Sequence, residues 1–316
     1  MQGLVIRNTG SNYIVATDGI PSQEIPCKIK GNFRIKGIRT TNPVAVGDHV
    51  TIGEPGPDGI AYITAITPRR NYIIRRASNL SKESHIIAAN VDLAMLVVTL
   101  AHPTTSTTFI DRFLATATAY GIPALIAVNK TDLLTDDDDR TLLDALAYLY
   151  RSIGYQVAFI SAKTGQGIDE LRKILAGKIT LVSGNSGVGK TTLINDLIPG
   201  LDLKTADISA VHDTGMHTTT FSELFRLPGE DGGAIIDTPG VRGFGTIDFD
   251  KYEVAHYFPE LFEISKDCRF GNCTHTHEPG CAVLAALDEN RIAQSRYASY
   301  LSILDDAQEG KYRKGY

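Results

Sequence analysis

Hydrophobic and polar residues alternate in five short runs over residues 1 to about 70. Turn residues separate the runs at short intervals, a spacing typical of a small all-β barrel. Five such strands suit an OB-fold, a partly open barrel whose exposed face binds nucleic acid. The predicted strands are residues 3–6, 13–16, 25–29, 48–52 and 61–66.

A different pattern begins near residue 90 and continues to Asp237. An apolar run at 91–100 is followed by an amphipathic helix near 107–120, and strands and helices alternate from there. This alternation predicts a mostly parallel sheet with helices on both faces. The basic stretch 67–88 predicts a linker between the two regions, either simply solvated or facing RNA phosphate.

The last part of the chain is aromatic and helical in pattern, with a helical remainder at 282–307. The expected fold class is therefore multidomain α/β: an N-terminal OB-fold barrel, a central P-loop domain with a parallel sheet, and a C-terminal helical domain. The predicted domains are residues 1–70, residues 71–245 including the linker, and residues 246–316.

A phosphate-binding pattern, G-x-x-x-x-G-K-[ST], lies at residues 184–191, after the apolar run 179–182 and at the start of a helical pattern. Its glycines let backbone N–H groups turn toward phosphate oxygens, Lys190 can reach the terminal phosphates, and Thr191 can hold Mg²⁺. The alternative is a glycine-rich turn without a ligand. The candidate nucleotide-binding residues are Gly184, Asn185, Ser186, Gly187, Val188, Gly189, Lys190, Thr191 and Thr192.

Two further motifs predict that the base is guanine. Asn129, Lys130 and Asp132 form N-K-x-D after an apolar strand candidate. The Asp132 carboxylate can accept from both the ring N–H and the exocyclic amine of guanine, a pair of donors that adenine lacks. The companion motif, which backs the base with main-chain donors, is Ser161, Ala162 and Lys163.

A D-x-x-G motif begins at Asp237 and ends at Gly240. It offers a strand-end carboxylate near the metal and a glycine N–H that can meet the γ-phosphate. Each short motif is weak alone, but together, each at a predicted strand end, they indicate a GTPase that binds GTP or GDP with Mg²⁺.

Three cysteines and a histidine near the C-terminus suit tetrahedral Zn²⁺, because thiolate and imidazole are its preferred ligands and four of them close a structural site. His277 is an alternative fourth ligand. The predicted ligands are Cys268, Cys273, His275 and Cys281.

Composition limits the possible partners and location. The 316 residues are 43% hydrophobic and 21% charged, with a net charge of −5, so RNA binding would require local basic patches. One candidate patch begins at Lys28 in the barrel. An equally good interpretation of these basic residues is that they lie on a solvated edge strand, where lysines prevent aggregation. No signal peptide or membrane span is recognisable, which predicts a cytoplasmic protein without a membrane partner. The other residues of this patch are Lys30, Arg34, Lys36 and Arg39.

The motifs stand in the order N-K-T-D, S-A-K, P-loop, D-T-P-G, a circular permutation of the order found in most GTPases. In this the chain resembles the family of circularly permuted GTPases that act on the small ribosomal subunit, ribosome small subunit-dependent GTPase A (RsgA, also called YjeQ), over nearly its whole length. The resemblance implies an RNA-binding barrel, the small subunit and its rRNA as partners, and the cysteine and histidine spacing of the family's zinc site. We expect a monomer.

Residues 214–220 resemble the first switch of this family, whose motif reads Gly-Arg-His-Thr-Thr, with Met216 in place of the arginine. Thr219 is the expected Mg²⁺ ligand beside Thr191 and Asp237, and Thr218 is the alternative. Val241 occupies the place where Ras-like enzymes carry a water-orienting glutamine. His217 is therefore the candidate within the chain to position the attacking water, with a ribosomal group as the alternative.

The expected function is GTP hydrolysis coupled to binding of the small ribosomal subunit during its late maturation, with release after hydrolysis. A second hypothesis is a nucleotide-gated adaptor for RNA or protein with incidental hydrolysis. A kinase is disfavoured by N-K-T-D. The permutation places the second switch close before the zinc segment, so nucleotide state is expected to set the position of that domain.

Overall fold

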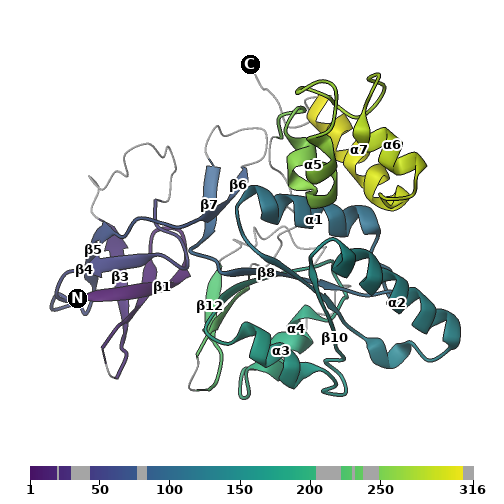
Figure 1. Ribbon diagram of the computed structural model, residues 1–316. Helices are drawn as coiled ribbons and strands as arrows, with labels where there is room; N and C mark the ends of the chain where they lie inside the picture. The colour runs from purple at the N-terminus through teal and green to yellow at the C-terminus, as the bar shows by residue number, and fades with distance from the viewer. Residues whose placement is uncertain are drawn as a thin grey trace, which may run out of the picture.

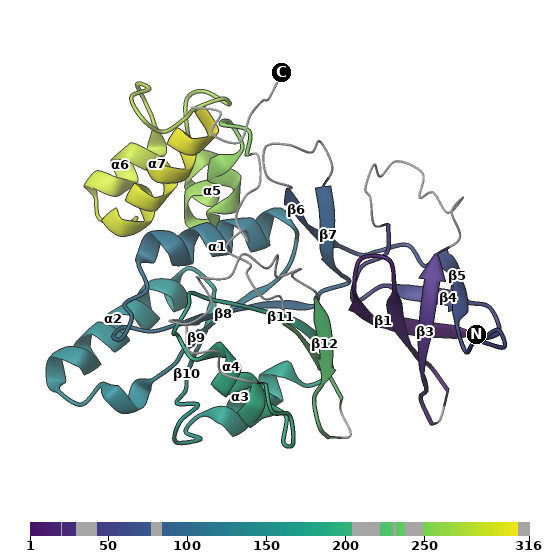
Figure 2. The same ribbon diagram turned by 180° about the vertical axis from the view of Figure 1, so that it is seen from behind.

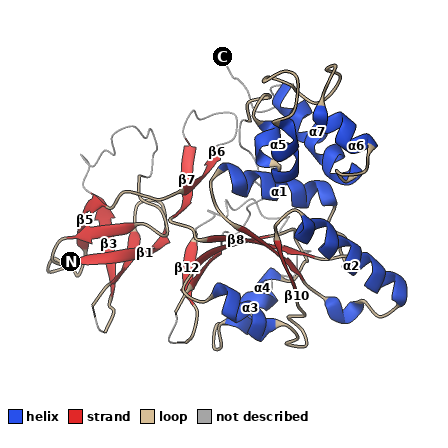
Figure 3. Cartoon of the chain, in the orientation of Figure 1, coloured by secondary structure: helices blue, strands red, loops and turns tan. Residues whose placement is uncertain are grey.

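The computed structural model describes residues 1–19, 21–29, 43–76, 84–203, 222–229, 232–237 and 249–308. Three parts are visible in Figure 1: a barrel at the N-terminus, a central sheet covered by helices, and a group of helices near the C-terminus. Among the described residues, the barrel consists of strands and the C-terminal part of helices (Figure 3). Across all the residues that the structure describes, no helix is both long and apolar enough to cross a membrane.

The N-terminal barrel has five strands in the order β1-β2-β3-β5-β4, and β4 pairs back with β1 to close the ring. Strands β3 and β5 run parallel and the other pairs antiparallel. Alternate side chains point inward, as in β3, where Ile25 and Cys27 are buried. The predicted five-stranded barrel is confirmed. Its strands are β1 (Gln2–Asn8), β2 (Tyr13–Thr17), β3 (Glu24–Ile29), β4 (His49–Ile52) and β5 (Ala61–Ile66).

The segment after the barrel forms a two-stranded antiparallel sheet of β6 (Tyr72–Arg76) and β7 (Ser84–Ala89). The prediction of a plain linker here is wrong, because the short apolar runs in the stretch pair with each other. Arg69 is buried and donates through Nε and Nη2 to the Asp48 carboxylate, each bond being 2.6 Å long. Its charge therefore holds the barrel rather than facing RNA.

The central sheet has the strand order β10-β9-β8-β11-β13-β12. The first five strands are parallel, and β12 runs antiparallel to β13. Every residue of β8 is buried, as expected for a strand covered on both faces. The strands are β8 (Leu93–Val98), β9 (Ala124–Val128), β10 (Gln156–Phe159), β11 (Ile179–Ser183), β12 (Glu223–Arg226) and β13 (Ala234–Asp237).

Two helices cover each face of this sheet (Figure 1). One face of β8, with Leu96, packs against α1 and α2, and the other, with Met95, packs against α3 and α4. Asp136 caps α2 by accepting from the backbone N–H of Asp139 at 2.8 Å, which accounts for the acidic run there. The helices are α1 (Thr107–Ala119), α2 (Asp137–Ser152), α3 (Ile168–Leu175) and α4 (Lys190–Leu197), and a short 3₁₀ turn, η1, spans Thr131–Leu133.

The barrel is joined to the central sheet through β12, which pairs with β1 at Arg7 and Glu223. The side chains of the same two residues form an ion pair. Figure 2 shows β12 on the side of the sheet that faces the barrel. The two regions therefore share one continuous run of eleven strands.

The C-terminal helices pack on α1 around a common core that includes Ala115 of α1 and Phe258 and Tyr300 of the C-terminal part. The remainder predicted to be helical consists of two helices, because the chain turns at 289–293, where Asn290 has a φ of 57°. The elements are η2 (Val254–Tyr257), α5 (Pro259–Ser265), α6 (Ala282–Asp288) and α7 (Gln294–Gln308).

Candidate nucleotide and metal sites

The loop at residues 184–189 joins the end of β11 to the start of α4. Gly184 and Gly189 have φ values of 148° and 92°. A Cβ added at Gly184 would lie 2.3 Å from Val97 O, and one at Gly189 would lie 2.5 Å from Asn129 Nδ2. Both positions thus require glycine for space as well as for backbone conformation, and the loop lies against the strand end that carries N-K-x-D.

The ammonium of Lys190 is held over this loop by backbone carbonyls of the loop. Its Nζ donates to Gly184 O and to Asn185 O, both at 2.7 Å. Burial lowers the pKa of Lys190, and the negative charge of Asp237 opposes that shift. A half-buried cation bonded to two carbonyls, with further donor capacity, fits a phosphate group.

Asn129 connects the loop with both base-recognition motifs. Its Nδ2 donates to Val188 O at 2.8 Å, and its Oδ1 accepts from the backbone N–H of Ala162 at 3.0 Å. The side chain is buried. One amide therefore uses both of its ends to hold three sequence-distant segments at the carboxyl ends of β9, β10 and β11.

Asp132 and Ser161 meet at the same edge of the sheet. Ser161 Oγ donates to Asp132 Oδ1 at 2.6 Å and accepts from the backbone N–H of Thr164 at 3.2 Å. Ser161 is fully buried, so this bond fixes the orientation of the carboxylate. A carboxylate with a defined orientation at this edge suits the paired donors of guanine. Lys163, by contrast, is exposed.

Asp237 ends β13 directly beside β11, in register with Val182. This register puts Asp237 at the sheet edge where the phosphate-binding loop begins at Gly184. Thr191 follows Lys190 in the first turn of α4 and is half-buried, whereas Thr192 is exposed. The remaining predicted site residues, Met216, His217, Thr218, Thr219, Gly240 and Val241, lie outside the described residues.

The structure also places at this site a segment that its sequence does not single out. Lys130 Nζ donates to His102 O. The next residue, Pro103, lies beside the phosphate-binding loop, with its Cδ 3.5 Å from a Cβ added at Gly187. A single histidine and proline in a polar loop give no recognisable motif, so only the fold reveals their position.

Cys268, Cys273, His275 and Cys281 form a cluster whose ligand atoms all lie within 4.8 Å of one another. His275 Nδ1 is 3.6 Å from Cys268 Sγ and 3.4 Å from Cys281 Sγ, and the two sulfurs are 3.9 Å apart. Tetrahedral Zn²⁺ with ordinary bond lengths separates its ligand atoms by about 3.4–3.8 Å. The donor set therefore fits zinc in its chemistry, and the distances among Cys268, His275 and Cys281 are close to those of a bound ion.

The alternative ligand His277 points elsewhere: it is exposed, and its Nδ1 lies 2.8 Å from Thr276 Oγ1. The loop around His275 is held by Glu278, which accepts from Thr274 Oγ1 at 2.6 Å and from three backbone N–H groups at 2.7, 3.0 and 3.2 Å. Burial alone would raise the pKa of Glu278, but these hydrogen bonds lower it well below its ordinary value. The carboxylate thus stays ionised and keeps the loop in shape.

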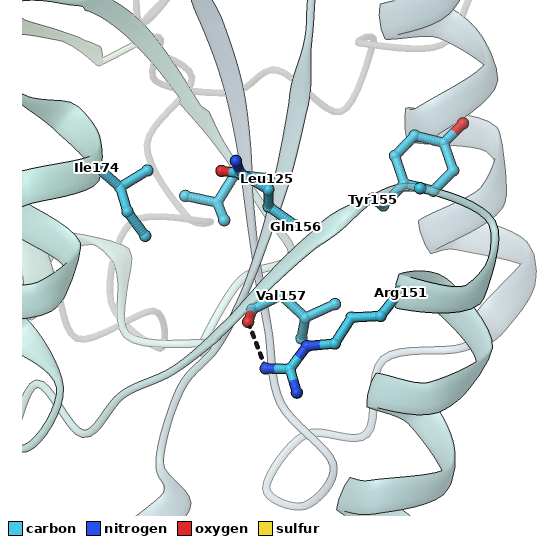
Figure 4. Close-up of a pocket in the computed structure, with 7 residues that line it drawn as sticks. Leu125, Arg151, Tyr155, Gln156, Val157 and Ile174 are labelled. Carbon is cyan, nitrogen blue, oxygen red and sulfur yellow. Dashed lines mark hydrogen bonds between the residues drawn. The ribbon is translucent and has the colours of Figure 1, made fainter.

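A surface hollow of about 440 Å³ lies away from both sites, where the amino ends of β9 and β10 meet α2 and α3 (Figure 4). Arg151 crosses it and donates to Val157 O at 2.8 Å. It contains none of the motif residues. Its lining is Leu125, Arg151, Gly154, Tyr155, Gln156, Val157 and Ile174.

Comparison with known proteins agrees with this arrangement. The family described as RsgA GTPase matches residues 66–247, and that described as RsgA N-terminal domain matches residues 2–63. Two proteins named small ribosomal subunit biogenesis GTPase RsgA, from Bacteroides fragilis (strain YCH46) and Porphyromonas gingivalis (strain ATCC 33277), are 60% and 59% identical to this chain, in each case over 100% of both chains.

Two crystal structures share the fold over nearly their whole length. YjeQ from Thermotoga maritima has a TM-score of 0.77 and 34% identity over 97% of this chain and 98% of its own. YloQ, described as a circularly permuted GTPase, has a TM-score of 0.75 and 29% identity over 100% of this chain and 96% of its own. With its motifs gathered at one sheet edge and its full-length likeness to these proteins, this chain belongs to the RsgA family of GTPases.

Proposed function

We propose that this protein hydrolyses GTP while bound to the small ribosomal subunit, acts in the late maturation of that subunit, and leaves it after hydrolysis. The observation that carries the proposal is the double hydrogen bond of Asn129, which ties the phosphate-binding loop and the S-A-K motif to N-K-x-D. Family membership supplies the guanine nucleotide and Mg²⁺.

In the proposed site, Asp132 accepts from the two N–H donors of guanine, and Ser161 holds that carboxylate in place. Lys130, Ala162 and Lys163 complete the base site. The phosphates lie in the loop from Gly184 to Thr192, where backbone N–H groups and Lys190 face them. Guanine is preferred over adenine because adenine would leave buried acceptors without donors.

Thr191, Asp237 and Thr219 are the proposed Mg²⁺ ligands. When bound, the ion would neutralise charge on the β- and γ-phosphates. His217 orients a water for in-line attack on the γ-phosphorus, and the Gly240 N–H meets a γ-oxygen. The bond from phosphorus to the β–γ bridging oxygen breaks, giving GDP and phosphate.

We further propose that Cys268, Cys273, His275 and Cys281 hold one structural Zn²⁺, which would fold a segment that has few large apolar residues. This site would stabilise the C-terminal domain, residues 246–316, next to the GTPase domain at 71–245. It takes no part in the proposed hydrolysis.

The proposed rRNA contact is the outer face of the barrel, residues 1–70. Lys28 of β3 is exposed and lies in register with Tyr62 of β5, which is 43% exposed. A cation beside an aromatic ring suits single-stranded RNA, which binds through phosphate charge and base stacking. The other basic residues of this stretch, from Lys30 to Arg39, lie outside the described residues.

The relatives' names refer to biogenesis of the small ribosomal subunit, which supports this partner and a cytoplasmic location for the present chain. We propose that the chain acts there as a monomer. The test is GTP turnover by the purified protein with and without purified small subunits, with large subunits as control. The protein should also co-sediment with small subunits in a non-hydrolysable GTP analogue and much less in GDP. Turnover that small subunits do not stimulate would favour the adaptor hypothesis instead.

A further inference from the structure

The loop between β8 and α1 leads from the central strand of the sheet to the edge where the nucleotide motifs gather. Its base is closed by two buried threonines: the backbone N–H of Thr105 donates to Thr99 O at 2.9 Å, and the backbone N–H of Thr99 donates to Thr105 Oγ1 at 3.1 Å. Thr99 Oγ1 also donates to Pro103 O. The tip of the loop, His102 and Pro103, is thus held in a defined place.

This tip contacts both halves of the nucleotide site at once. His102 O accepts from Nζ of Lys130, the lysine of N-K-x-D. Pro103 packs beside Gly187 in the middle of the phosphate-binding loop. A nucleotide whose base lies at Asp132 and whose phosphates lie in the loop would bring its ribose and α-phosphate near this tip, because the tip contacts residues of both motifs.

The backbone of His102 is itself unusual, with a φ of 50° in the left-handed region. A residue with a Cβ rarely adopts this conformation, so surrounding contacts must hold it. Its side chain is exposed rather than packed in the core. An exposed imidazole on a backbone that is held at the edge of a ligand site can donate a hydrogen bond to an anionic or hydroxyl oxygen.

We propose that His102 is a nucleotide-binding residue, whose imidazole donates a hydrogen bond to the ribose–α-phosphate part of bound GDP or GTP. The inference rests on the proposed guanine-nucleotide site. Because that part is common to both nucleotides, His102 contributes equally to binding of GDP and of a GTP analogue. In this it differs from a switch residue, which responds to the γ-phosphate.

The first test is chemical footprinting of the full-length protein with diethyl pyrocarbonate, read out by peptide mass spectrometry. Saturating GDP and a non-hydrolysable GTP analogue should each slow carbethoxylation of His102 at least fivefold. His49, exposed on β4 of the barrel, is the internal control and should react at the same rate throughout. Modification of His102 at an unchanged rate in nucleotide-saturated protein would overturn the proposal.

The second test is affinity, measured by calorimetry with GDP and with the analogue. His102→Ala should weaken both about tenfold, the scale of one hydrogen bond to a charged group, and His102→Gln, which keeps a donor, should lose less. His49→Ala should stay within twofold of the wild type. Wild-type affinity in His102→Ala would overturn the proposal even if footprinting showed protection. Failure of the wild-type protein to bind GDP would instead refute the proposed function.

Discussion

Arg296 of α7 and Asp111 of α1 form a buried ion pair across the boundary between the C-terminal helices and the central sheet, with Nη1 and Oδ1 2.7 Å apart. Glu260 of α5 accepts from Arg296 Nε at 2.7 Å, and Tyr150 Oη of α2 donates to Asp111 at 2.8 Å. One network therefore joins four helices. Any nucleotide-driven movement of the C-terminal helices must carry α1 with it or break this network.

Removal of the acidic partner should be costly. Asp111→Ala leaves the guanidinium of Arg296 buried with less compensation and should lower the free energy of unfolding by about 3–5 kcal/mol. Denaturant unfolding measures the change. Asp306→Ala is the matched control. It breaks a partly exposed ion pair between Asp306 of α7 and Arg112 of α1 and should lower the free energy of unfolding by about 1 kcal/mol or less. Equal losses in the two variants would contradict the role assigned to burial.

The proposed base site predicts that base selectivity depends on Asp132. Asp132→Asn should weaken GTP binding and favour xanthosine triphosphate, since xanthine carries a carbonyl where guanine carries an amine, and the new amide can donate to it. Competition between the two nucleotides in a fluorescence binding assay measures the switch. An unchanged preference for GTP would remove Asp132 from the base site.

The close approach of Gly189 to Asn129 predicts a strong effect of one methyl group. Gly189→Ala would push the Asn129 amide away from Val188 and should weaken GDP binding about tenfold or more, because the buried hydrogen bond that aligns the loop with the base motifs would be lost. Gly200→Ala is the control for backbone strain. Gly200 also has a positive φ, of 85°, but nothing lies within 4 Å of an added Cβ, so this variant introduces strain without a steric contact. Its GDP affinity, measured by calorimetry, should match the wild type.

Zinc content should follow the cysteine cluster. The purified protein should carry close to one zinc per chain by elemental analysis, and Cys273→Ser should lose it while still binding GDP, because the cluster lies outside the nucleotide site. Cys27→Ser makes the same substitution at a buried cysteine of the barrel and should keep the metal. A wild-type zinc content in the Cys273 variant would refute the proposed ligand set.

Water positioning by His217 predicts a selective loss of catalysis. His217→Ala should leave nucleotide affinity nearly intact but lower subunit-stimulated GTP turnover about 10²-fold or more, the usual effect of losing a positioned acid or base. Single-turnover assays with confirmed nucleotide occupancy measure the step. Stimulated turnover at the wild-type rate would point to a group supplied by the ribosome.

Local patterns in the sequence were sufficient to predict features that depend on neighbouring residues alone. Alternation fixed the faces of the barrel strands, and the spacing of glycines around Lys190 marked a strand-to-helix turn. The same patterns could not show that Arg69 binds Asp48 or that Arg296 binds Asp111, because each pair joins residues far apart in the chain. Such a choice of partner depends on the assembled fold, and no feature of a single arginine reveals it.

The strand pairing within the segment at 67–88 and the position of His102 could not be predicted from the sequence, for related reasons. Two short apolar runs flanked by arginines resemble a linker until they are seen to pair, and a histidine in a polar loop carries no periodic signal. The motif residues, in contrast, are constrained by the chemistry of one ligand. That shared constraint fixes the residue types and spacing within each motif, so the amino-acid sequence alone is enough to predict them.

The permuted order has a consequence for how the chain folds. Strand β8 lies in the middle of the sheet, yet its partner β11 comes much later: the backbone N–H of Ile179 donates to Asp92 Oδ2 at 2.9 Å across 87 residues of chain. At ordinary rates of translation, β11 is synthesised about 4 to 17 s after β8. Throughout that interval the wholly apolar β8 has one unpaired edge, the kind of edge on which chains aggregate. The permuted order therefore leaves the central strand of the sheet open to edge-to-edge association until β11 has been made.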